Sequence, residues 1–111
     1  MTNVYTIDQD RWAKMSIFDQ IGNIYSEVGR SFNAQRRHNT GDCQASIYRA
    51  IDLFDATINA LVTTNSPRSK EVLRAKEQYL ATISDSNASQ EAIQSLDRYF
   101  MQFAVAARLN R

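Results

Sequence analysis

Apolar residues recur with helical spacing along four stretches of the chain, at steps of three and four in three of them, which places these residues on one face of an α-helix. The stretches cover about 16–38, 42–63, 67–84 and 89–109. Their apolar residues are, in turn, Phe18, Ile21, Tyr25, Val28 and Phe32; Ile47, Ile51, Phe54, Ile58 and Leu61; Val72, Leu73, Tyr79, Leu80 and Ile83; and Ile93, Leu96, Phe100, Phe103 and Ala107. No stretch keeps the two-residue alternation of a strand, so the pattern predicts helices and no sheet.

Residues that start or break helices separate these stretches. Ser16 and Asp42 are suitable N-caps for the first and second helices, and Ser66 followed by Pro67 favours the start of the third. The connections are short, which favours antiparallel neighbours. We therefore predict a single all-α domain over 1–111, an up-down-up-down four-helix bundle preceded by a short leading helix that carries Trp12.

Composition narrows the class of protein. The chain has 111 residues, of which 43% are hydrophobic and 23% charged, and its net charge is +1. These values exclude a disordered chain, and the lone Cys43 excludes a disulfide scaffold. No apolar run reaches the roughly 18 residues of a membrane span, and residues 1–8 do not resemble a secretory signal. We therefore expect a cytoplasmic protein without membrane attachment.

Three small residues, Gly22, Ser26 and Gly29, lie on one line of the first predicted helix. A glycine inside a helix costs about 1 kcal/mol relative to alanine, so two of them need a reason. The favoured interpretation is close packing against the backbone of another helix. The alternative interpretation is a groove that receives a ligand or a partner.

The last predicted helix is apolar on more than one side. Met101, Val105 and Leu109 form a line within its polar arc, which we call the ridge. An exposed apolar line on a small protein usually marks an interaction surface. We predict that the ridge meets another chain, most simply a second copy, which makes a homo-oligomer. The alternative is that the leading segment, with Val4, Ile7 and Trp12, folds over it.

Charged residues suggest one polar network. Glu27 and Arg30 share one side of the first helix, and Asp55 lies beside the apolar stripe of the second. A charge inside a bundle is costly unless it is paired. We therefore expect a bridge from Arg30 to either Glu27 or Asp55.

Two basic clusters are candidate phosphate contacts, because arginine pairs well with phosphate oxygens. Arg36 and Arg37 lie at one pole of the predicted bundle, and Arg68, Lys70 and Arg108 lie at the other. The alternative is ordinary salt bridging on helix surfaces. No aromatic residues interleave with these clusters, so binding of nucleic acid is not the favoured interpretation.

The residues offer little for catalysis. His38 is the only histidine and Cys43 the only cysteine, which is too few for a zinc site and gives no activated nucleophile. No glycine-rich phosphate loop is present. We therefore expect no catalytic residue, no cofactor and no metal.

Three blocks resemble a family of short all-helical bacterial proteins: GNIYSEVGR at 22–30, RAIDLFDATI at 49–58 and YFMQFAVAAR at 99–108. The resemblance extends from about Trp12 to Arg108 and implies a small helical bundle without an established activity. Residues 47–61 are more loosely similar to a helix of HEPN domains, the partners of minimal nucleotidyltransferases in toxin–antitoxin pairs. Active HEPN domains carry arginine, four to six residues, then histidine. His38 has no arginine at that spacing, which puts such ribonuclease activity in doubt.

These observations leave three hypotheses. The first is a non-enzymatic helical-bundle interaction protein that self-associates or binds a partner protein. The second is an accessory bundle that binds nucleic acid through its arginine clusters. The third is a HEPN-like component of a toxin–antitoxin pair.

Overall fold

The structure is a computed structural model that describes residues 7–85 and 87–109, apart from the side chains of 104 and 106–108. Within these residues it contains five helices, four of them long: α1 (Gln9–Lys14), α2 (Ile17–Arg36), α3 (Thr40–Thr63), α4 (Arg68–Ser84) and α5 (Gln90–Leu109). No strand occurs in this part of the chain. The predicted all-helical class is confirmed over these residues, and so is the leading helix with Trp12.

Side chains cap the starts of α2 and α3. Ser16 Oγ accepts a hydrogen bond from the Asp19 N–H at 3.1 Å, as its position predicted. The prediction of Asp42 as a cap is wrong, because α3 starts earlier and the Asn39 side chain accepts the Asp42 N–H at 3.1 Å. Asn39 Nδ2 also donates to Asp42 Oδ2 at 2.8 Å, so both ends of the amide hold the first turn of α3.

His38 ends α2 in the left-handed conformation, with φ of 58°. Its N–H donates to Gln35 O at 3.0 Å, and the Asn39 N–H donates to Ala34 O at 2.9 Å. This is the pair of bonds of a Schellman motif, in which glycine usually takes the left-handed position. The only histidine of the chain therefore has a backbone role at a helix end.

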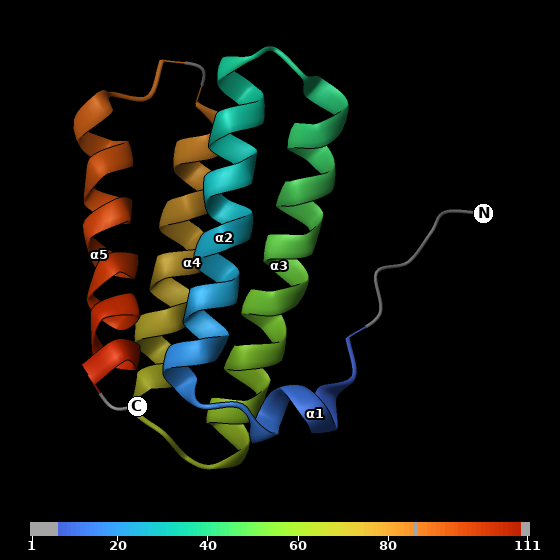
Figure 1. Cartoon of the computed structure of the whole chain (residues 1–111), viewed down its shortest axis with the longest axis vertical. Helices are drawn as coiled ribbons and strands as arrows, with labels where there is room; N and C mark the ends of the chain where they lie inside the picture. Colours follow the sequence, from blue (N-terminus) through green and yellow to red (C-terminus); the bar gives the residue numbers. More distant parts are fainter. Residues whose placement is uncertain (1–6, 86, 110–111) are drawn as a thin grey trace.

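The four long helices run side by side (Figure 1). Both α2 and α4 pack against α3 and α5, and α2 also touches α4. The short α1 contacts α3 near one end of the molecule (Figure 1). Trp12 Nε1 donates to Thr57 Oγ1 on α3 at 2.9 Å, and Gln20 Nε2 on α2 donates to Trp12 O at 2.9 Å. These buried bonds fix α1 against α2 and α3.

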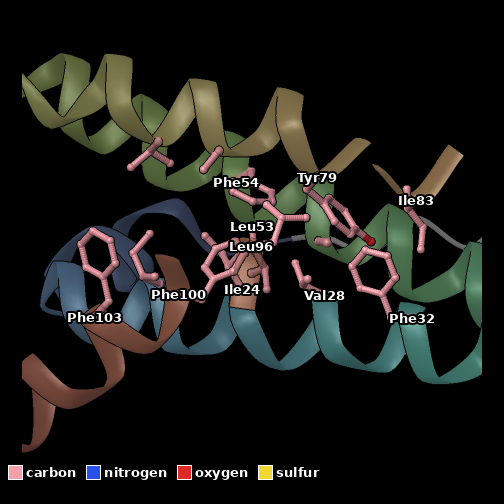
Figure 2. Packing of buried hydrophobic residues seen from close by; sticks show 14 of the residues in the cluster. Ile24, Val28, Phe32, Leu53, Phe54, Tyr79, Ile83, Leu96, Phe100 and Phe103 are labelled. Carbon is pink, nitrogen blue, oxygen red and sulfur yellow. The ribbon is translucent and has the colours of Figure 1, made fainter. Parts of the chain in front are cut away.

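Aromatic rings from the long helices meet in the core (Figure 2). Phe54 lies between Tyr79 and Phe100, with a centroid distance of 6.1 Å to each. Tyr79 has no exposed surface; its hydroxyl donates to Ser31 Oγ at 2.7 Å, and Ser31 Oγ donates to Val28 O at 2.7 Å. Burial raises the pKa of Tyr79 to about 12. A short hydrogen-bonded chain thus links α4 to α2 inside the apolar core.

The face that α3 buries differs from the predicted one. Four of its five predicted core residues are only partly buried: Ile47, Ile51, Ile58 and Leu61. Ala56 and Thr57 are buried instead, on the side where Gln9 Nε2 of α1 donates to Ala56 O at 3.0 Å. Because α1, α2 and α4 all pack on α3, a wider arc is covered than one apolar stripe. On α4, Leu73 was also predicted in the core and is exposed.

Candidate functional site

The ridge on α5 is exposed. Met101, Val105 and Leu109 keep 45%, 46% and 78% of their surface open, although all three are apolar. The alternative, that the leading segment covers the ridge, is wrong for the described residues of that segment. Trp12 is buried, and its ring N–H donates to Thr57 on α3. Helix α1 therefore packs against α3 and not against the ridge on α5. Val4 lies outside the described residues.

Among the described residues, the glycines of α2 are not sites of close packing, contrary to the favoured prediction. A Cβ added at Gly22 or Gly29 would meet no heavy atom within 4 Å among the described residues. Ser26 on the same line is exposed, and its Oγ donates to Gly22 O at 3.2 Å. The reason is that large rings separate α2 from α5. Phe18 meets Phe103 at 6.4 Å between centroids, and Tyr25 stacks on Phe100 at 5.7 Å.

The separation of these two helices leaves a groove of about 600 Å³. Ser26 and Gly29 line it from α2, and Gln94 and Asp97 line it from α5. Tyr25 also lines it, and its hydroxyl donates to Asp97 Oδ1 at 2.9 Å. Partial burial, with the hydrogen bond and the negative charge of Asp97, raises the pKa of Tyr25. An open groove therefore lies beside two of the three small residues, Ser26 and Gly29.

The predicted polar network is present in part. Glu27 is buried, and its Oε1 lies 3.2 Å from Arg30 Nη1. Its other oxygen accepts a hydrogen bond from Arg49 Nε at 3.0 Å, a partner that the sequence analysis missed. Arg49 is the only basic residue in 40–63, so it is the one cation that this stretch can offer to an acid on a neighbouring helix.

Asp55 does not belong to this network, which corrects the prediction. It pairs with Lys76 Nζ on α4 at 2.7 Å. Asp55 lies six positions beyond Arg49, and at about 100° per residue this turns its side chain away from α2. Desolvation by burial raises the pKa of Asp52, and the negative charge of the nearby Asp55 adds to this effect.

The two basic clusters lie at opposite ends of the molecule. Arg36 lines the groove between α2 and α5, and its guanidinium donates to Asn33 Oδ1. Arg68 at the start of α4 lies 5.8 Å from the centre of the Phe103 ring, so part of its surface faces an aromatic ring rather than solvent. Lys70 is exposed on α4, and the side chain of Arg108 lies outside the described residues.

Arg37 belongs to a second hollow, which we call the cleft. The cleft lies between α2 and α3 and has a volume of about 340 Å³. Arg30 and Arg49 from the polar network also line it. The structure therefore brings one of the predicted phosphate contacts together with both cationic partners of Glu27.

Comparisons with protein-family models, curated proteins and solved structures find no match to this chain. Among the described helices, none is long and apolar enough to span a membrane. The described side chains also contain no group of three or more His, Cys, Asp or Glu placed to hold a metal ion.

Proposed function

We propose that the four long helices form an up-down-up-down four-helix bundle and that the chain is a non-enzymatic interaction protein. In this proposal it self-associates through the ridge on α5. Contacts that run from α2 to α3, α4, α5 and back to α2, with short loops between consecutive helices, support the bundle. The exposure of Met101, Val105 and Leu109 carries the proposed self-association.

The spacing of the ridge suits contact with a second copy. Its residues are four positions apart, and rows with this spacing interdigitate in the commonest packing of two helices, with axes crossing near about −50°. A row on one α5 meets the same row of a second copy when a two-fold axis relates the two chains. Such a contact is closed and does not continue into a filament.

The size of the ridge predicts the strength of association. Three partly exposed side chains present a few hundred Å² at most, whereas a stable interface buries about 800 Å² per partner. Self-association through the ridge is therefore expected to be weak. The dimer should form as protein concentration rises rather than persist at high dilution.

Light scattering over a concentration series tests the proposal. The wild-type mass should rise toward that of a dimer, and Val105→Asp should remain monomeric, because a carboxylate would be buried at the contact. The matched control is Val62→Asp on α3, where the valine is 58% exposed and lies away from the ridge. A wild-type chain that stays monomeric throughout contradicts the proposal, as does equal loss of association in both variants.

A further inference from the structure

The cleft between α2 and α3 collects positive charge from both helices. Three arginines line it: Arg30 and Arg37 from the α2 side and Arg49 from α3. Two of its other lining residues, Ala34 and Ala45, are small, which leaves room between the guanidinium groups. Arg30 and Arg49 lie within helices, and Arg37 is the C-cap residue of α2, so their backbone positions are well defined.

The buried carboxylate of Glu27 pairs with two of these arginines. Its oxygens lie 3.2 Å from Arg30 Nη1 and 3.0 Å from Arg49 Nε, and only 10% of the Glu27 side chain is exposed. Arg49 Nη2 is further fixed by Ser46 Oγ at 3.2 Å. Each guanidinium carries several N–H donors, and these contacts leave others available. One carboxylate thus holds two cations close together without neutralising both.

The charge that remains in the cleft is positive. Arg37 adds a third guanidinium, whose Nε donates to Asn33 O at 3.4 Å, and Asp42 is the one acidic residue in the described lining. The Asp42 carboxylate already accepts a hydrogen bond from Asn39 at 2.8 Å. With Glu27 beneath, three cations face two carboxylates.

We propose that this cleft binds a phosphate group, and specifically a phosphate monoester of a small molecule. A monoester has three terminal oxygens, which suits donors from three guanidinium groups, and arginine pairs bidentately with such oxygens. A phosphodiester offers only two free oxygens. The described lining has no aromatic side chain on which a nucleobase could stack, which favours a small phosphate over a nucleic acid. This site is independent of the ridge and of self-association.

An NMR titration with inorganic phosphate at constant ionic strength tests the proposal. The amide signals of Ala34, Ala45 and Ser46 should shift and saturate, and chloride should not produce these shifts. Arg37→Gln should weaken binding by about tenfold, because it removes a charged hydrogen bond but does not touch Glu27. The matched control is Arg98→Gln, which removes the same charge from an exposed position on α5 and should leave the affinity unchanged.

A second variant and a second ligand complete the test. Arg30→Gln should also weaken phosphate binding, because it removes one of the three guanidinium groups. The buried Glu27 carboxylate is not left unpaired in this variant, since Arg49 still pairs with it. Shifts that do not saturate, or equal weakening by Arg98→Gln, would overturn the site. A single-stranded RNA that displaces phosphate from the same amides and binds more tightly would overturn the assignment to a small phosphate. Failure of RNA to displace phosphate would support it.

Discussion

Replacing Ser31 by alanine should destabilise the protein more than replacing Tyr79 by phenylalanine, although both changes remove the same hydrogen bond. Neither residue has exposed surface. The Tyr79 hydroxyl donates to Ser31 Oγ at 2.7 Å, and Ser31 donates in turn to Val28 O at 2.7 Å. The bond is therefore one step of a directed chain, and its two partners are not equivalent.

The direction of the two hydrogen bonds, from Tyr79 to Ser31 and from Ser31 to Val28, sets how much each variant is destabilised. In Tyr79→Phe, Ser31 keeps its own acceptor, so the loss is one net hydrogen bond, or about 1 kcal/mol in the free energy of unfolding. In Ser31→Ala, the buried Tyr79 hydroxyl keeps its proton but has no acceptor. That desolvation penalty, together with the lost bond to Val28, gives about 2 to 3 kcal/mol, and the better helix propensity of alanine returns about 0.5 kcal/mol.

Urea denaturation of the wild type, both single variants and the double variant measures these values. The double variant should cost less than the sum of the singles by about 1 kcal/mol, because the phenylalanine ring has no hydroxyl that could be left without an acceptor when the serine is replaced. A larger cost for Tyr79→Phe than for Ser31→Ala would refute the direction of the chain. Additive costs would refute the coupling between the two residues.

Two further predictions concern the same fold. The free energy of unfolding should keep its full value below about pH 10 and fall by about 2 to 3 kcal/mol toward pH 12, because the folded state holds the Tyr79 proton to a pKa of about 12, against 10.0 for the ordinary group. Denaturation measured across that range should show a smaller loss for Tyr79→Phe. Tyr25 and Tyr99, whose pKa values burial also raises, should account for the loss that remains in this variant. Gly29→Ala should raise the free energy of unfolding by about 1 kcal/mol, since the added methyl group meets open space in a helix interior. A lower melting temperature for this variant would contradict this reasoning.

Features that belong to a single helix could be read from the sequence. The helical spacing of apolar residues located the long helices to within about two residues at every end, and the Ser16 cap followed from its position before an apolar run. The ridge of Met101, Val105 and Leu109 could be recognised for the same reason. So could the pairing of Glu27 with Arg30, because residues three apart on a helix are neighbours whatever the helix packs against.

Features that join different helices could not be read in this way. Arg49 reaches Glu27, and Asp55 turns to Lys76, because of how α3 is rotated between its neighbours. Gly29 faces a groove because Phe18 and Tyr25 meet rings from α5 and keep the two helices apart. Helical periodicity fixes the direction in which each side chain projects around the axis of its own helix. The rotation and separation of two helices depend on the volumes of all the side chains packed between them, and these come from distant parts of the chain.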